Sequence, residues 1–445
     1  MILAIDQGTT GTTCLVFDED GEVAGRAYRE FEQHSPRPGW VEHDAREIWD
    51  VTRGVAADAL DDAGTAELHA IGITNQRETV CVWDPKTGEP LHRALVGQDR
   101  RTADRCTELR EAGREELVRA KTGLTIDPSF SATKIAWLLR NVDGLADNAR
   151  SGRAVFGTVD AWLIFNLTGE LATDQTNASR TLLCDRDKTA WDPELLDVFG
   201  IPANALPKIV PSIGEVGRTR DDALPGWDGV PVSGIAGDQQ AALYGQACLD
   251  PGQGKSTYPG TGSSLLLNVG DRVPKPPPGV LATVAWAIGQ RTFYALEAST
   301  SVPGAAMQGP RGGSGIPSET EGLARATLEA TAFQTLDCIR VMDIAATEPL
   351  RELRADGGAS ENAWLMQFQA DVLGVPVVVP EVTQTTAMGA AFLAGVGCGR
   401  WTQGEVRRLW REGARYEPAM SEDERSTRHA EWTRAVERAR GWAAG

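Results

Sequence analysis

The chain has 445 residues, 41% of them hydrophobic, and a formal net charge of −18. This length suits two domains rather than one core, and the negative charge makes nucleic acid and anionic membranes poor partners. The sequence contains no apolar run of membrane-spanning length. The seven cysteines form no C-x-x-C pair and Asp6 follows the first apolar residues too soon for a signal peptide, so we expect free thiols in a cytoplasmic protein.

The first quarter of the chain predicts a hairpin, a helix and a buried strand. Apolar strands at 2–5 and 14–17 flank the polar Gly/Thr turn 6–11, and a third strand begins near residue 22. A helix is expected over 44–62, with Asp44 as its N-cap. The apolar strand 70–74 runs into Arg77 and Glu78, and a short strand follows at 79–83.

The second half repeats this pattern. Strand 232–236 ends at Gly237-Asp238-Gln239-Gln240, before a helix expected over 241–248. A second Gly/Thr turn, 257–264, precedes strand 265–268. The repeated strand–turn–strand unit indicates two related lobes with a cleft between them, which we divide into domains 1–243 and 244–445.

The remaining elements predict a third glycine turn and a closing helix. The turn 355–362 lies between a strand at 350–355 and a helix at 363–373. A strand at 377–379, a small-residue helix at 387–396 and a C-terminal helix at 432–442 follow. The Gly-rich stretch 309–317 is typical of a flexible connector.

Several polar residues stand where predicted strands end. Asp6 is suited to hold Mg²⁺ or to bond its own turn, and Asp238 to cap a helix or to act as a general base. Arg77 and Glu78 offer a donor and an acceptor for vicinal hydroxyls, or form a surface ion pair. Glycines and threonines in the turns suit phosphate binding, although ordinary hairpin bends share that composition.

The order of these motifs resembles the FGGY family of carbohydrate kinases over nearly the whole chain, and most closely those members that phosphorylate glycerol. The matching strings include residues 6–10 (Asp-Gln-Gly-Thr-Thr), 72–79 (Gly-Ile-Thr-Asn-Gln-Arg-Glu-Thr), 176–181 (Thr-Asn-Ala-Ser-Arg-Thr), 233–242 (Ser-Gly-Ile-Ala-Gly-Asp-Gln-Gln-Ala-Ala) and 356–359 (Asp-Gly-Gly-Ala). The resemblance implies an α/β fold of two ribonuclease-H-like lobes around an interdomain cleft, as in actin, Hsp70 and hexokinase. It also implies ATP-dependent phosphorylation of glycerol, or a similar small polyol, to sn-glycerol 3-phosphate.

The same resemblance assigns roles to individual residues. Asp238 is the expected general base and Asp6 the expected Mg²⁺ residue. The expected acceptor-binding residues are Arg77, Glu78, Ser129, Asp238 and Gln239. Those expected to bind ATP are Thr9, Thr10, Gly11, Thr13, Thr261, Gly304, Gln308, Gly358 and Asn362. The sequence leaves a homo-oligomer open.

Three departures from the family pattern concern the acceptor and the phosphates. Small residues, Gly97, Ser129 and Ser264, stand where the family has an aromatic wall, and Thr13 replaces an arginine of the first phosphate loop. Between Gln308 and Arg325 the family carries several tens more residues, so we expect a shortened second lobe with its connector at 309–324. Two alternatives therefore stay open: a kinase for a larger polyol or ketose, and a degenerate paralogue that binds nucleotide without turnover.

Overall fold

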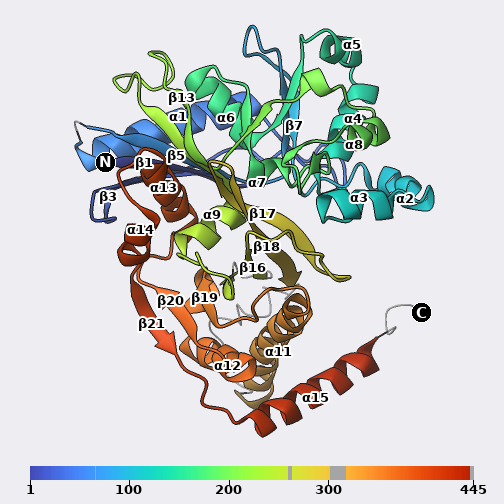
Figure 1. Ribbon diagram of the computed structural model, residues 1–445, viewed down its shortest axis with the longest axis vertical. Coiled ribbons are helices and arrows are strands. Elements are labelled where there is room, and N and C mark those ends of the chain that lie inside the picture. The colour runs from blue at the N-terminus through green and yellow to red at the C-terminus, as the bar shows by residue number, and fades with distance from the viewer. Residues whose placement is uncertain (66, 259–262, 301–316, 441–445) are drawn as a thin grey trace.

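The computed structural model describes residues 1–65, 67–258, 263–300 and 317–440, with the side chains of the last range described from residue 325 onward. Its main feature is a 13-stranded sheet in the order β21-β20-β19-β15-β16-β18-β17-β13-β14-β5-β1-β2-β3. Most elements of the first half of the chain lie at one end of the molecule and most elements of the second half at the other (Figure 1). β13 (Ile213–Arg218) and β17 (Leu281–Ile288) are neighbours in the middle of the sheet. They join its two halves by pairing Ile213 with Ile288.

Each half of the sheet contains the same five-stranded unit. In the first half the order is β3-β2-β1-β5-β14, with bounds Val23–Glu30, Gly11–Phe17, Ile2–Gln7, Ala70–Asn75 and Pro231–Gly237. In the second it is β18-β16-β15-β19-β20, with bounds Arg291–Thr300, Ser263–Gly270, Gln253–Thr257, Glu352–Asp356 and Val377–Pro380. In both units the first three strands pair antiparallel and the last three parallel. The duplication and the predicted two-lobed α/β fold are thereby confirmed.

Helices occupy equivalent places in the two units. α1 (Ala45–Ala63) lies in sequence between the third and fourth strands of the first unit, and α11 (Pro317–Asp343) between those of the second. Asp44 caps α1 as predicted, because its Oδ1 accepts from the backbone N–H groups of Arg46 and Glu47 at 2.8 and 3.3 Å. The other helices of the units are α6 (Val159–Thr168), α7 (Gln175–Ala178), α9 (Asp238–Gly245), α12 (Ala363–Leu373) and α13 (Thr385–Gly397).

A smaller layer with its own core is attached to the first half. It holds β4 (Glu42–His43), β6 (Val80–Trp83), β7 (Pro90–Leu95) and β8 (Val155–Thr158), in the order β4-β7-β6-β8. Its helices are α2 (Ala103–Glu111), α3 (Glu115–Thr122), α4 (Ser131–Asn141), α5 (Leu145–Arg150) and α8 (Pro193–Phe199). The remaining elements are the pairs β9 (Ala172–Asp174)/β12 (Lys208–Val210) and β10 (Cys184–Asp185)/β11 (Ala190–Trp191), with η1 (Ala203–Ala205), η2 (Gly358–Glu361), α14 (Gln403–Leu409), β21 (Glu412–Tyr416) and α15 (Glu422–Ala439).

The helix α13 ties the two halves together. It comes from the C-terminal part of the chain, yet it packs on β1, β5 and β14 of the first unit and on α9 (Figure 1). Glycines make this close approach possible: a Cβ at Gly72 would stand 2.1 Å from the carbonyl oxygen of Ala390, and one at Gly389 1.8 Å from that of Ala241. The contact therefore requires glycine, which has no side chain, at these two positions.

Several predicted boundaries are wrong, and three of them are the starts of helices. α9 begins at Asp238 rather than residue 241. α15 begins at Glu422, ten residues before the prediction, because Ser421 caps it and three acidic residues occupy its first turn. α11 begins at Pro317, so residues 317–324 of the expected connector are helical; proline suits a first helical position because its missing N–H has no partner there. Residues 309–316 lie outside the described part.

Two further predictions stand as follows. The domain boundary at 243/244 falls in the last turn of α9 and stays a prediction. Within the described ranges, no helix combines the length and the apolar character needed to cross a membrane.

The glycine contact beneath α13 can be tested with Gly72→Ala. The added Cβ would clash with backbone rather than with a flexible side chain, so we expect a loss of about 3 kcal/mol in the free energy of unfolding by urea. Gly404→Ala is the matched control, because its nearest neighbour would lie at 3.8 Å, and it should be neutral or slightly stabilising. Equal stabilities for the two variants would contradict this account of the packing.

Candidate active site

The polar residues predicted at strand ends gather where the two units meet. Asp6 is near the end of β1, Arg77 and Glu78 follow β5, and Asp238 begins α9 directly after β14. β1, β5 and β14 are parallel neighbours, so their carboxyl ends share one edge of the sheet. This topology explains why residues 6, 77 and 238 come together although more than 60 positions separate each from the next.

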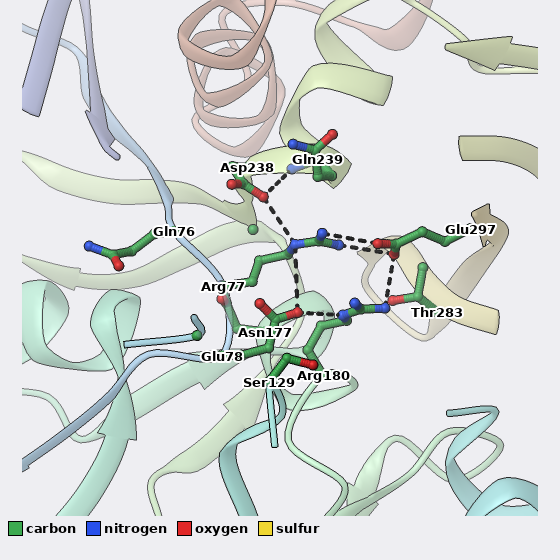
Figure 2. A network of polar contacts seen from close by, with 12 residues as sticks. Gln76, Arg77, Glu78, Ser129, Asn177, Arg180, Asp238, Gln239, Thr283 and Glu297 are labelled. Carbon is green, nitrogen blue, oxygen red and sulfur yellow. Dashed lines mark hydrogen bonds and ion pairs between the residues drawn. The ribbon is translucent and has the colours of Figure 1, made fainter. Parts of the chain in front are cut away.

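Arg77 is the centre of the cluster (Figure 2). Its side chain is 11% exposed, and its Nε lies 3.0 Å from Asp238 Oδ1 and 3.8 Å from Glu78 Oε1. Its Nη1 and Nη2 donate to Glu297 Oε2 and Oε1, both at 3.0 Å. The alternative of a surface ion pair between Arg77 and Glu78 is therefore wrong: one guanidinium contacts three carboxylates in a largely buried site.

Glu297 and Arg180 complete the cluster, and the sequence did not predict either as a site residue. Arg180 donates through Nε to Glu78 Oε1 at 2.8 Å and through Nη1 to Glu297 Oε2 at 2.9 Å. Burial alone would raise the pKa of Glu297, but Arg180 and Arg77 outweigh it and lower that pKa to about 2. Glu297 is thus a permanent anion on β18 of the second unit, and it joins the two halves of the chain.

Asp238 has the environment expected of a general base. Its side chain is 32% exposed, and its Oδ1 accepts from the backbone N–H of Gln239 at 2.6 Å. Burial raises the pKa of Asp238 while Arg77 opposes that rise. The N-cap of α9 is Gly237, so the helix-cap alternative for Asp238 is wrong. A carboxylate with a raised pKa and a free face is a better proton acceptor than an ordinary one.

Asp6 lies close enough to Asp238 to feel its charge. Burial, followed by the negative charge of Asp238, raises the pKa of Asp6 to about 7. Two carboxylates that disfavour each other's ionisation suit a shared cation. Among the residues with described positions, no three His, Cys, Asp or Glu side chains gather as a metal cage. Asp6 could hold a hydrated Mg²⁺, because this ion needs only one or two carboxylates beside the phosphates of a nucleotide.

The first Gly/Thr turn, predicted to bind phosphates, joins β1 to β2. The backbone N–H of Gly8 donates to the carbonyl of Gly11 at 2.9 Å, which leaves Thr9 and Thr10 at the tip. Thr13 stands opposite Asp6 in the strand register, so it is near the carboxylate but carries no charge. Of the second turn, Thr261 lies outside the described residues.

The turn after β19 is the one predicted to contact the nucleotide. Gly357 has φ +82° and its Cβ would collide with the backbone of Tyr258, whereas a Cβ at Gly358 would meet nothing within 4 Å. Gly358 is therefore open toward a ligand. Asn362 uses its Oδ1 to cap α12, accepting from the N–H of Leu365 at 3.1 Å. Gly304 and Gln308 lie outside the described residues.

Small residues border the acceptor side of the cluster. A Cβ at Gly97 would lie 3.3 Å from the carbonyl oxygen of Arg77 and 3.7 Å from Glu78 Oε2, so this glycine lies directly against the cluster. Ser129 lies in the segment next to Glu78 and Arg180: Ser131 Oγ donates to the carbonyl of Glu78 at 3.1 Å, and Arg180 stacks on Phe130. The Ser129 hydroxyl itself donates to Asp127 at 2.6 Å. Ser264 pairs in register with Thr257 and Ser299.

The charge on Asp6 can be tested through the pH dependence of stability. A folded-state pKa raised from 3.8 to about 7 gives stability that is fully present below pH 4 and lost as the pH rises through 7. Without Mg²⁺ or nucleotide, Asp6→Asn should therefore lose less stability than the wild type between pH 5 and pH 8, by roughly 2–4 kcal/mol. The control Asp20→Asn, in an exposed turn, should follow the wild type, and parallel curves for Asp6→Asn would refute the buried pair.

Glu297→Gln tests the buried ion cluster. This variant removes the anion between Arg77 and Arg180, so we expect it to lower the free energy of unfolding by about 3 kcal/mol in urea at pH 7. Glu19→Gln breaks an ion pair with Arg400 in which both side chains are well exposed, and it should change stability by less than about 0.5 kcal/mol. A Glu297→Gln variant as stable as Glu19→Gln would show that the cluster does not stabilise the fold.

Comparisons with known proteins agree with this geometry. Residues 1–245 match the N-terminal domain model of the FGGY family of carbohydrate kinases, and residues 253–398 match its C-terminal domain model. The chain is 47% identical to a glycerol kinase of Trichlorobacter lovleyi and 45% identical to glycerol kinase 2 of Thermotoga maritima, covering 99% of this chain and 99% of each relative. The first alignment spans 494 positions. This chain has 445 residues, so several tens of that relative's residues have no counterpart here.

Solved structures give the same result. The fold superposes on that of a Plasmodium falciparum glycerol kinase with ADP at a TM-score of 0.91 and 32% identity, over 98% of this chain and 97% of that one. A gluconate kinase of Lactobacillus acidophilus shares the fold at a TM-score of 0.87 and 20% identity, over 100% of this chain and 98% of that one. The chain therefore belongs to the FGGY family of carbohydrate kinases.

Proposed function

We propose that this protein transfers the γ-phosphoryl group of ATP to a terminal hydroxyl of glycerol, forming sn-glycerol 3-phosphate and ADP. The observation that carries the proposal is the pairing of Asp238 with Arg77 at 3.0 Å, beside Glu78, where two ribonuclease-H-like units meet. Full-length relatives named glycerol kinase support the choice of acceptor.

In this proposal the residues around Arg77 bind and activate the acceptor. Glu78 accepts hydrogen bonds from hydroxyls, and Gln239 contributes a side-chain amide. The guanidinium of Arg77 has five N–H groups, and four of them point to Glu297, Gln240 and Asp238. Counting only partners among the described residues, one N–H on Nη2 is left for the acceptor. Asp238 takes the proton of the reacting hydroxyl as the new O–P bond forms and the bond to ADP breaks.

The nucleotide and its cation are assigned to the two turns and to Asp6. Thr9, Thr10, Gly11 and the open Gly358 are the proposed ATP contacts, to which Thr13, Thr261, Gly304, Gln308 and Asn362 are added by resemblance alone. Asp6 would hold Mg²⁺ through water, and bound Mg²⁺ supplies charge neutralisation on the phosphate oxygens. Five of the seven cysteines are buried and all are free thiols, which supports a reducing, cytoplasmic location.

The first experiment is a coupled assay of ADP release with glycerol and Mg²⁺-ATP. Asp238→Asn keeps the shape of the side chain but removes the base, so we expect kcat to fall 10²- to 10⁴-fold. Asp147→Asn, on an exposed helix, is the control and should match the wild type. A turnover unchanged by Asp238→Asn would overturn the role of this residue, and binding of ATP without turnover on any acceptor would favour the degenerate paralogue.

A second candidate function, phosphorylation of a larger polyol or ketose, is favoured by the small size of the residue at position 97, a glycine that lies against Glu78. A panel of C3 to C6 polyols and ketoses distinguishes the two functions. If glycerol is the acceptor, its kcat/KM will be the highest of the panel. A higher kcat/KM for a five- or six-carbon compound would replace glycerol by that acceptor.

A further inference from the structure

Lys255 is a buried cation beside Gln239, and the proposed chemistry assigns it no role. It lies on β15, its residue is 0% exposed, and it is one of only seven lysines in the chain. The ammonium donates to two neutral oxygens, Gln239 Oε1 and Thr257 Oγ1, the second at 2.8 Å. The first of these bonds crosses from the second unit to the opening turn of α9, next to Asp238.

The charges around Lys255 come from four elements. Asp356 on β19, Asp238 on α9 and Glu297 on β18 favour its charged form, whereas Arg77 after β5 and burial oppose it. Burial is the largest of these effects and lowers the pKa of Lys255. Burying the charge of a lysine at this position costs free energy of folding, and an apolar side chain of similar length would cost less. Its hydrogen bonds therefore call for an explanation beyond packing.

The direction of the hydrogen bond from Lys255 to Gln239 provides an explanation for the buried lysine. An ammonium group can only donate, so Gln239 must present its carbonyl oxygen to Lys255. The Gln239 amide nitrogen, which can only donate, is then the group left for the acceptor. A hydroxyl held by this nitrogen has to accept that bond through a lone pair, and its own proton remains free to point at the neighbouring carboxylate of Asp238.

We propose that Lys255 is a positioning residue that fixes the orientation of the Gln239 amide, and thereby the direction of the hydrogen bond that Gln239 makes to the acceptor hydroxyl. The inference rests on the proposed function, because it assumes that a polyol binds beside Gln239. Lys255 itself does not touch the acceptor; it acts through Gln239. Without the ammonium, the amide can turn and offer oxygen instead of nitrogen.

The test compares KM values for glycerol and for ATP in Lys255→Met, which keeps the length of the chain but removes the donor. We expect KM for glycerol to rise about tenfold, the value of one hydrogen bond, with KM for ATP within twofold of the wild type. Lys255→Arg, which keeps a donor, should recover part of the loss. Lys86→Met, in an exposed turn, is the matched control and should change neither KM.

A double-mutant cycle with Gln239→Ala separates positioning from a general structural effect. If Lys255 acts through Gln239, then Lys255→Met will raise KM for glycerol in the wild-type background but not in Gln239→Ala. Thermal unfolding midpoints no lower than that of the wild type show that the variants are folded, which we expect because Met removes a buried charge.

Four results would overturn the inference. Fully additive effects of the two substitutions, or a rise confined to KM for ATP, would mean that Lys255 acts elsewhere, for example on a phosphate. A Lys255→Met enzyme with the kinetics of Lys86→Met would remove the positioning role while leaving the kinase intact. A wild-type protein that phosphorylates no polyol would instead refute the proposed function, and with it this inference.

Discussion

The site depends on one buried guanidinium. Arg77 contacts Glu297, Asp238 and Glu78, and without it three carboxylates would face one another in a largely buried space. Like charges this close cannot all ionise unless a cation compensates them. Arg180 shares that task at Glu78 and Glu297 but has no ion pair with Asp238. Arg77 is thus the residue that links the charge of Asp238, the proposed base, to the charge of Glu297 on the second unit.

The backbone topology of the sheet determines where the charged residues of the site lie. Residues 6, 77 and 238 are separated in sequence, but parallel β1, β5 and β14 bring their ends to one edge. α13 then fixes the second unit on the first through contacts too close for any side chain at Gly72 or Gly389. The same packing places β15 under the start of α9, which brings Lys255 within reach of Gln239. The geometry of the proposed site is therefore a consequence of the strand order and of glycines at a few close contacts.

Much of this could be predicted from local sequence and some could not. Four site residues were predictable because each lies at or just after the end of an apolar strand, where a buried charge without a partner is costly. They are Asp6, Arg77, Glu78 and Asp238. Glu297, Arg180 and Lys255 were not predictable, since their partners lie far away in the chain: 220 residues separate Arg77 from Glu297. The charge of Glu297 inside the apolar part of β18 is the signal that could have revealed it, whereas Lys255 lies in a polar strand, Gln253–Thr257, which carries no such signal. The start of α15 was missed because its first three turns are polar, although the cap at Ser421 was readable.

The central claim is that Arg77 sets the protonation of Asp238, and the pH dependence of kcat/KM for the acceptor tests it most directly. Burial raises the pKa of Asp238 and Arg77 counteracts that rise. Loss of the cation in Arg77→Met should therefore move the acidic limb of the profile to higher pH, whereas Arg77→Lys, which keeps a positive charge, should move it less. An acidic limb at the same pH in the wild type and in Arg77→Met would contradict the claim.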